Sequence, residues 1–389
     1  MERKESKIPF VGLHAHSVAS VFDGLGYPSE HMDFAYNNGM DALALTDHGN
    51  MNGLAYQVMH AQKMQKEGKD FKPIFGVEAY FLPSVSEWRE DYERIREEKA
   101  KLKKRMAKEE DASGATIEVE ADTKSAIKNI LNRRRHLVLL AQNQTGLYNL
   151  FQLISKSYMQ ENYYRFPRLD YALLKEHNEG IIASSACLGG VYAGDFWQNR
   201  EQGDDAVLDA MRETSKKMVD IFGDRWYAEV QWNRIKEQHE LNKYVIQVAE
   251  EFGIKLVSTA DSHYPNPALW KQREIYKQIG WKGIQNESKL PDNHEEMPYQ
   301  LYPKNGDEMW TSYKEYSRDC GFEYDDNVVR DSITETHHIA HERISRFLPS
   351  NEVRLPSFVV PEGKTASGAL IDCATEGLQQ AGLGKKPVY

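Results

Sequence analysis

The sequence lacks a cysteine framework, a long apolar run and a secretion signal. Its three cysteines, Cys187, Cys320 and Cys373, are odd in number and far apart, so we expect no disulfides and a reducing compartment. No apolar run approaches the roughly 20 residues that span a bilayer, and Met1–Lys7 has no apolar core of the secretory kind. These absences predict a cytoplasmic chain without a membrane partner.

Positive charge is also scarce relative to negative charge. The formal net charge is −10, so the surface as a whole does not attract polyanions, and contact with nucleic acid requires local basic clusters. The 389 residues, 40% of them hydrophobic, are enough for one large folded domain and an appendage. We therefore expect a soluble protein whose function has to be found in its motifs.

What is present is an alternation of short apolar segments with helical patterns. Seven segments are predicted as strands: Ile8–Leu13, Ala42–Thr46, Phe71–Tyr80, His136–Ala141, Gly180–Cys187, Trp226–Val230 and Ile254–Ala260. Most are followed by a segment long enough for a helix. Continuously apolar strands that alternate with helices predict a parallel sheet covered on both faces, which is either open or closed into a barrel.

Three regions are predicted along the chain. Residues 1–285 form the α/β domain, interrupted at 84–128 by a densely charged insertion. Because both signs of charge mix in that insertion, a solvated helix is favoured over a nucleic-acid-binding arm. Residues 286–348 are predicted to complete the domain, and the proline-punctuated stretch that begins at residue 349 marks a boundary before a last helix, Thr365–Leu383.

The first motif lies near the start of the chain, where His14 and His16 flank Ala15 on an extended segment. Alternate side chains of an extended segment point to the same side, so both imidazoles can reach one metal ion. Alone, such a pair is as easily an accident as a metal site. Polar residues lie at or just past the end of most of the other predicted strands, and His136 opens its own strand. Polar groups from so many strand ends converge on one face only in a barrel, so we predict a (β/α)7-type barrel.

The candidate site combines imidazoles, carboxylates and one thiol. Its members are His14, His16, Asp23, His48, Glu78, His136, Cys187, Asp261 and His263. These ligand types suit zinc, manganese or iron, and nine groups are too many for a single ion. We therefore expect two or three divalent ions. Clustered ions suit phosphoester hydrolysis because they lower the pKa of a bridging water and stabilise charge on phosphate oxygens.

Several members of this set also have an ordinary structural explanation. His136 fits a partly buried core histidine, Glu78 a salt-bridge partner and Cys187 an inert buried thiol. Asp23 is followed by Gly24 in a turn, where aspartate is common for turn reasons alone. Spacing by itself leaves these alternatives open.

Further polar residues lie beside the candidate site in the sequence. Asp47 is interpreted as a group that orients a ligand or a loop, and the role of Glu229 stays undecided. Arg134 and Arg135, directly before His136, are candidates for gripping a substrate phosphate, although a solvated end of the insertion explains them equally well. The eight other histidines fall on predicted helices or loops and are assigned no chemistry.

Six motifs follow one another in order: His14–Ser17, Ala44–Asn50, Gly76–Tyr80, His136–Ala141, Ser184–Gly190 and Ala260–Tyr264. Together they resemble the polymerase and histidinol phosphatase (PHP) family, and within it the PHP domain at the N-terminus of bacterial DNA polymerase III alpha subunits. A further stretch, Leu355–Gly363, is similar to the entry into the palm of that polymerase. This similarity implies that residues 349–389 begin a palm-like region.

The resemblance implies a distorted seven-stranded barrel with a trinuclear metal centre at the C-terminal end of its strands. It implies that all nine candidate residues are ligands, including Asp23, which spacing left open. Among them we expect Asp23, Asp261 and His263 to act in catalysis by assisting proton transfer. Some members of the family have lost ligands and are only structural, whereas every position here carries a side chain able to bind a metal.

The complete ligand set favours a metal-dependent phosphoesterase, namely a 3′-5′ exonuclease that proofreads at the 3′ end of a DNA primer. The expected partners are the remainder of a DNA polymerase III alpha subunit or other replisome subunits. Because the palm aspartates are not in this sequence, we expect no polymerisation by this chain alone. Two alternatives stay open: a catalytically silent docking module of the polymerase, and a small-molecule phosphomonoesterase that resembles histidinol phosphatase.

Overall fold

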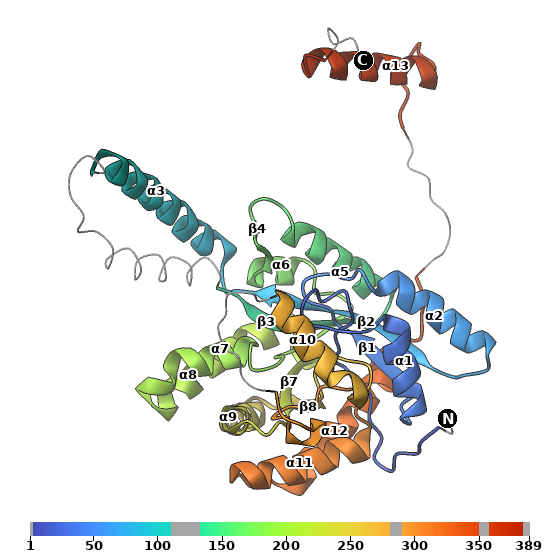
Figure 1. The fold of residues 1–389 in the computed structure, drawn as a ribbon, viewed down its shortest axis with the longest axis vertical. Helices are drawn as coiled ribbons and strands as arrows, with labels where there is room; N and C mark the ends of the chain where they lie inside the picture. Colours follow the sequence, from blue (N-terminus) through green and yellow to red (C-terminus); the bar gives the residue numbers. More distant parts are fainter. Residues whose placement is uncertain (1–2, 110–132, 281–289, 350–357, 384–389) are drawn as a thin grey trace. The chain divides into compact units, whose positions relative to one another are not determined.

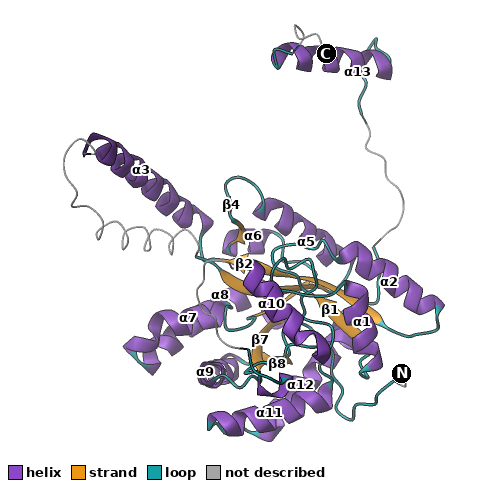
Figure 2. Cartoon of the chain, viewed as in Figure 1, coloured by secondary structure: helices purple, strands orange, loops and turns teal. Residues whose placement is uncertain are grey.

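The computed structural model describes residues 3–109, 133–280, 290–349 and 358–383 (Figure 1). Contacts divide the chain into two compact units, residues 1–348 and 349–389. The first unit is built on a curled sheet with helices around it (Figure 2). None of the helices in the described ranges is both long and apolar enough to cross a lipid bilayer.

The sheet has eight strands among the described residues, in the spatial order β4-β5-β2-β3-β6-β7-β8, with β1 beside β2. Their bounds are β1 Ala42–Leu45, β2 Lys72–Phe81, β3 Arg135–Ala141, β4 Tyr163–Tyr164, β5 Phe166–Leu169, β6 Ile181–Ser184, β7 Trp226–Gln231 and β8 Lys255–Thr259. Every residue of β1, β6 and β7 is buried, as expected for strands covered on both faces.

The segment Gly12–His16 closes this sheet. Gly12 forms a parallel bridge with Leu43 of β1, and Ala15 forms one with Ser262, just beyond β8. The backbone amide of His16 donates to the carbonyl of Ser262 at 2.7 Å. The strands at the two ends of the curled sheet are thereby joined, and the predicted distorted α/β barrel is confirmed.

The prediction of an all-parallel sheet is wrong for β3. This strand runs antiparallel to both of its neighbours, β2 and β6, whereas β1–β2, β6–β7 and β7–β8 are parallel. In the register of β2 and β3, Tyr80 near the end of β2 lies opposite His136 at the start of β3. The beginning of β3 therefore lies at the same end of the barrel as the C-terminal ends of the parallel strands.

Helices surround the sheet. In the first unit they are α1 Pro28–Asn37, α2 Leu54–Lys66, α3 Val85–Glu109, α5 Gln144–Ser157, α6 Tyr171–Glu176, α7 Val191–Asn199, α8 Asp204–Phe222, α9 Lys236–Phe252, α10 Trp270–Gly280, α11 Gly306–Cys320 and α12 Asp326–His338. Helix α8 shows why they form: Val207, Met211, Met218 and Phe222 recur at helical spacing and are buried. Such apolar stripes pack on the sheet and hold the strand ends in place.

A π-helical turn, η5 Ile339–Arg343, continues α12 and fills the end of the barrel where β1 and β2 begin. Ile339, Ala340 and Ile344 belong to one buried cluster with residues from inside the barrel, among them Leu13. The ammonium group of Lys72, at the start of β2, donates to the carbonyls of Ala340 and Ile344. The segment after residue 325 thus seals the barrel opposite the strand ends that carry the candidate ligands.

The charged insertion predicted at 84–128 is described only to residue 109, where it forms helix α3; residues 110–128 lie outside the described residues. Its first turns are anchored to the barrel. Val85 and Trp88 are buried in a small cluster with Leu82, and the guanidinium of Arg168 lies 4.2 Å from the Trp88 ring centroid. The described part of the insertion therefore begins as a packed element.

The second unit contains helix α13, Ala366–Gln380. Thr365 begins it, because its side-chain oxygen accepts a hydrogen bond from the amide of Gly368. The sequence prediction of a helix over Thr365–Leu383 is close to these bounds. Of the stretch Leu355–Gly363, predicted from its resemblance to begin a palm-like region, residues 355–357 lie outside the described residues.

A buried lysine gives the folded chain a pH dependence that can be measured. Lys304 is 2% exposed, and burial lowers its pKa to about 8, although Glu308 opposes the shift. The unfolded side chain titrates near 10.4. Between these values the unfolded chain binds a proton that the folded chain does not, so stability rises with pH over about 8 to 10.4. We expect Lys304→Met to stabilise the chain at pH 7 by up to about 3 kcal/mol and to abolish this rise in thermal melts. The exposed Lys243→Met should do neither.

Candidate metal centre

All nine predicted ligands come together at one end of the barrel. His14 and His16 lie on the closing segment and His48 follows β1, while Glu78 is in β2 and His136 begins β3. Cys187 follows β6, Asp261 and His263 follow β8, and Asp23 reaches the group from the loop after His16. His136 takes part because β3 is antiparallel, which puts the start of that strand at the ligand end.

Glu78 is the centre of the group and is fully buried. Its Oε1 lies 3.2 Å from His14 Nε2 and 3.0 Å from His136 Nδ1. Its Oε2 lies 2.6 Å from His48 Nδ1 and 3.4 Å from His16 Nε2. One carboxylate therefore faces four imidazoles, an arrangement that suits bridging between metal ions better than a single ion pair.

Asp261 and Asp23 extend the group beyond the contacts of Glu78. Asp261 Oδ1 lies 3.3 Å from both His14 Nε2 and His16 Nε2. Asp23 Oδ2 lies 3.0 Å from His48 Nε2 and 3.3 Å from His263 Nε2. The backbone of Asp261 has φ +47°, a strained left-handed conformation for a residue other than glycine. Such strain is typical of functional sites, where the surrounding structure holds it in place.

Cys187 closes the group next to His136. Its Sγ lies 3.4 Å from His136 Nδ1 and 3.7 Å from Glu78 Oε1. Burial, reinforced by the charge of Glu78, raises the pKa of this thiol well above its usual value. A coordinated metal deprotonates a thiol outright, so the environment keeps Cys187 protonated until an ion is present.

The residues fit a cluster of divalent metal ions. Glu78 Oε2 and Asp261 Oδ1 are buried and have no hydrogen-bond partner among the described residues, and buried polar atoms without partners are costly. His14 Nε2 and His16 Nε2 lie 3.2 Å apart with both imidazoles fully buried. Ligands about 2.0–2.1 Å from a tetrahedral ion lie about 3.3 Å from one another. The separations of 3.2 to 3.4 Å among these four side chains agree with that spacing.

The two imidazoles His14 and His16 respond in opposite ways to their buried and charged surroundings. Burial lowers the pKa of His16 to about 3, helped by neighbouring imidazoles. Burial also disfavours charge on His14, but the surrounding carboxylates outweigh it and raise the pKa of His14. The imidazoles hold the pKa of Glu78 and of Asp261 below the usual range in spite of burial. Ionised carboxylates and a neutral His16 are the states that metal binding requires.

Glu229, undecided from the sequence, holds His14 in place. Its Oε1 lies 2.8 Å from His14 Nδ1 and accepts a hydrogen bond from Thr259 at 2.6 Å, while its Oε2 accepts one from Ser184 at 2.7 Å. A carboxylate on one ring nitrogen directs the lone pair of the other, Nε2, into the group.

Asp47 acts as the sequence suggested, by ordering a loop. Its carboxylate accepts hydrogen bonds from the Ser17 amide and hydroxyl and from Ser20 Oγ. Ser20 Oγ in turn lies 3.0 Å from His16 Nδ1.

Arg273 of α10 pairs with Asp23 and fixes that carboxylate. Sequence analysis missed Ser20 and Arg273, which carry no local signal because their role comes from distant partners.

The two arginines proposed to grip phosphate point in different directions. Arg135 forms an ion pair with Asp195 of α7 at 2.7 Å and does not reach the ligand group. Arg134 lies 3.8 Å from the Phe166 ring centroid and 5.3 Å from that of Tyr80. Tyr80 stacks on His48, so Arg134 is the one that borders the site. Arg134 directly precedes β3, and side chains alternate along an extended chain, so Arg134 and His136 lie on one side and Arg135 on the other.

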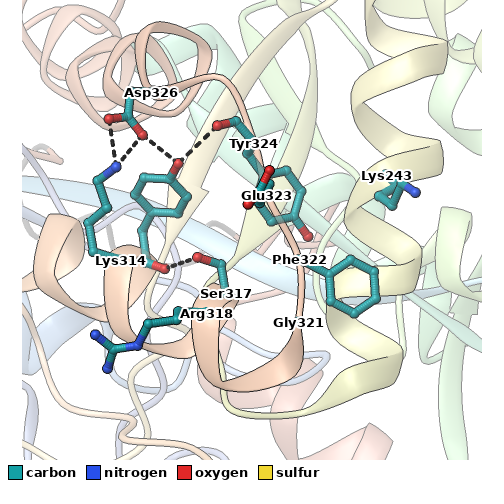
Figure 3. Close-up of a pocket in the computed structure, with 10 residues that line it drawn as sticks. Lys243, Lys314, Ser317, Arg318, Gly321, Phe322, Glu323, Tyr324 and Asp326 are labelled. Atoms are coloured by element: carbon teal, nitrogen blue, oxygen red, sulfur yellow. Dashed lines mark hydrogen bonds and ion pairs between the residues drawn. The ribbon is translucent and has the colours of Figure 1, made fainter.

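A large hollow elsewhere on the first unit is separate from this site. It measures about 810 Å³ and lies between α9 and α11, with Lys243, Lys314, Arg318 and Phe322 among its lining residues (Figure 3). Lys314 is already paired there with Asp326. None of the nine candidate ligands lines it, so size alone does not identify the functional site.

The contact between Glu229 and His14 leads to a testable prediction. We expect Glu229→Gln to lower metal affinity about 10- to 100-fold, because the amide no longer fixes the tautomer and orientation of His14. Metal titration monitored by mass spectrometry measures the change. The conservative exchange keeps the hydrogen bond to Ser184, so an unchanged affinity would mean that Glu229 only supports the fold.

Comparison with known proteins agrees with these motifs. The family model described as PHP domain matches residues 12–233, more than half of the chain. The DNA polymerase III subunit alpha of Aquifex aeolicus is 33% identical over 66% of this chain and 18% of its own length. That of Deinococcus radiodurans is 31% identical over 93% of this chain and 23% of its own. The chain thus spans about a fifth of the length of these relatives.

Among solved structures, a two-domain protein from Bacteroides vulgatus contains a predicted PHP-like metal-dependent phosphoesterase. It aligns with 70% of this chain and 60% of its own, at 15% identity and a TM-score of 0.34.

Proposed function

The chain belongs to the PHP domain family, and on that basis we propose that it is a metal-dependent phosphoesterase that removes nucleotides from the 3′ end of DNA. The observation that carries the proposal is the convergence of nine ligand-capable side chains on one end of the barrel, where two buried carboxylate oxygens lie against imidazole nitrogens but accept no hydrogen bond. Two or three zinc, manganese or iron ions would be held there by His14, His16, Asp23, His48, Glu78, His136, Cys187, Asp261 and His263. When bound, such ions stabilise charge on a phosphate and lower the pKa of water.

Substrate approaches the nine-residue ligand group from its solvent-exposed side. The side chain of Asp23 is 26% exposed, that of His136 is 20% exposed, and that of Glu78 is fully buried. Glu78 therefore serves as a fixed internal ligand, while Asp23 and its neighbours meet the phosphodiester. His263 and His48, together with Arg273, hold the pKa of Asp23 well below its usual range in spite of burial, and Arg273 also fixes this carboxylate in place.

Proton transfer is assigned to the pair of Asp23 and His263, with Asp261 beside it. His263 Nε2 lies 3.3 Å from Asp23 Oδ2, and its Nδ1 lies 2.7 Å from the carbonyl oxygen of Asp261. The second contact fixes the ring with Nε2 directed at Asp23, so that Nε2 can exchange a proton with the leaving oxygen when it does not hold an ion. Asp261, in its strained conformation, holds its carboxylate against His14 and His16.

Aromatic side chains beside the group favour a nucleic acid over a small phosphomonoester. Tyr80 stacks on His48 with ring centroids 5.7 Å apart and contacts Phe166 at 5.2 Å. Nearby, Tyr158 and Tyr163 stack on each other at 5.6 Å and are about half exposed. With Arg134 over Phe166, they provide the combination of stacking faces and positive charge that binds single strands. Arg134 supplies one positive charge beside the site, which favours contact with a polyanion on a surface that is negative as a whole.

The aromatic pair can be tested separately from the chemistry. We expect Tyr158→Ala combined with Tyr163→Ala to lower kcat/KM on single-stranded DNA about fivefold or more relative to an aryl phosphate, because stacking contributes about 1–3 kcal/mol per base. Tyr148→Ala, an exposed tyrosine on α5, is the matched control. An equal loss on both substrates would contradict a role in holding the strand.

The 31–33% identity to DNA polymerase III alpha subunits supports a place in a replication complex. We propose that the partners are the remainder of such a subunit or other replisome proteins, in the cytoplasm. In that setting, an exonuclease beside a polymerase removes misincorporated nucleotides.

The deciding experiment is incubation of the metal-loaded chain with a primer labelled at its 5′ end, in manganese or zinc. Stepwise shortening from the 3′ end is expected. Hydrolysis of an aryl phosphate without DNA shortening would indicate a phosphomonoesterase. Bound metal without either activity would indicate a docking module.

A further inference from the structure

A second group of metal-ligand side chains lies at the opposite end of the barrel from the metal centre. Asp41 directly precedes β1, whereas His48 follows it. The four residues of β1, at about 3.3 Å each, separate these places by roughly 13 Å or more. The other two members, His337 in α12 and His341 in η5, come from the segment that seals this end. The proposed function uses none of these three residues.

The donor atoms of this group converge. His341 Nε2 lies 3.0 Å from Asp41 Oδ1, and His337 Nε2 lies 3.7 Å from Asp41 Oδ2. The two imidazole ring centroids are 4.3 Å apart. One ligand atom from each of the three side chains lies within 4.8 Å of the other two. Residues four apart on a helix lie on one face, so the spacing of the two histidines produces this pairing.

The neighbourhood leaves the three side chains available to a metal. The ammonium group of Lys72, the nearby cation, is directed to the carbonyls of Ala340 and Ile344. The side chains are 28 to 39% exposed, so an ion can enter from solvent.

We propose that Asp41, His337 and His341 bind one zinc ion that clips the start of β1 to the helical segment sealing the barrel. Two imidazoles and a carboxylate form a common zinc ligand set, with water as the fourth ligand. The clip joins parts of the chain about 300 residues apart in sequence, and because the ligands converge only in the folded chain, binding stabilises the fold. The proposed site is open, with three protein ligands instead of the four of closed structural zinc sites. Its expected effect is on stability, and it is independent of the exonuclease proposal.

Zinc content measures the clip directly. The full chain and the variant His337→Ala/His341→Ala are stripped with a chelator, equilibrated with micromolar zinc and assayed by mass spectrometry of the metal. We expect the variant to hold one zinc fewer per chain and to lose part of the zinc-dependent rise in Tm, with unchanged phosphoesterase activity. His338→Ala, which removes the adjacent histidine outside the group, should match the parent.

Equal zinc content in the parent and a folded double variant would overturn the proposal, as would an equal loss in His338→Ala. If the double variant fails to fold, anomalous diffraction from zinc-soaked crystals of the parent chain decides. A peak between Asp41, His337 and His341 supports the clip, and its absence at full occupancy of the metal centre refutes it.

Discussion

Stripping the metal ions with a chelator is expected to lower the Tm of the chain by about 7–11 °C. An ion at a hundred times its Kd contributes about 2.7 kcal/mol to the folded state, so two or three ions contribute about 5–8 kcal/mol. Without them, the buried Glu78 and Asp261 keep oxygens that have no hydrogen-bond partner among the described residues. Differential scanning calorimetry before and after chelation, with restoration by added manganese or zinc, measures the effect.

The decrease in Tm on metal removal should be larger at higher pH. In the metal-free chain the carboxylates raise the pKa of His14 in spite of its burial. A histidine whose pKa is higher in the folded chain than in the unfolded chain stabilises the protein at pH values below its unfolded pKa, which is near 6.5. This contribution is lost as the pH rises through the folded pKa. Metal binding itself strengthens as protons leave the ligands. We therefore expect a larger difference in Tm at pH 8 than at pH 6.

These melts are best performed in the His337→Ala/His341→Ala background, so that the proposed second zinc site does not contribute. An unchanged Tm after chelation, with removal of metal verified, would mean that the centre is empty or lies outside the cooperative fold.

Replacing a ligand of the main centre is expected to remove activity. His14→Ala or Asp261→Ala should lower 3′-5′ hydrolysis of DNA about a hundred- to a thousandfold or more, equivalent to about 2.7–4 kcal/mol of transition-state stabilisation. Both side chains are buried and lie 3.3 Å apart. Removing either leaves the others with unpaired charge, so metal content and Tm should fall together with the rate.

The matched control is His60→Ala. His60 lies on α2 and pairs with the half-exposed Asp33 at 2.9 Å, away from the ligand group. It should keep its metal, its Tm to within a few degrees and its full activity. A ligand variant that lost its metal and stability yet hydrolysed DNA at the parent rate would place the chemistry elsewhere on the chain.

The chemistry of the site was open to prediction because it depends on residue type and on position relative to strand ends. Apolar runs such as Ala42–Leu45 and Ile181–Ser184 are short and continuous, and polar ligands follow them directly. In a barrel the ends of parallel strands meet, so His48, Cys187 and Asp261 could be brought together without knowledge of a single contact. Asp23 was the exception, since a turn aspartate carries no such positional signal.

Only the tertiary structure decided the direction of β3, the closure of the sheet by Gly12–His16 and the separation of Arg134 from Arg135. An apolar strand pattern is the same in either direction, because direction is set by which distant strands it pairs with. The supports of the ligands were hidden for the same reason. Glu229 fixes His14, Arg273 fixes Asp23, and Asp41 meets His341 across hundreds of residues. The sequence by itself determined which groups are able to bind metal, and the folding of the chain decided which groups hold them in position.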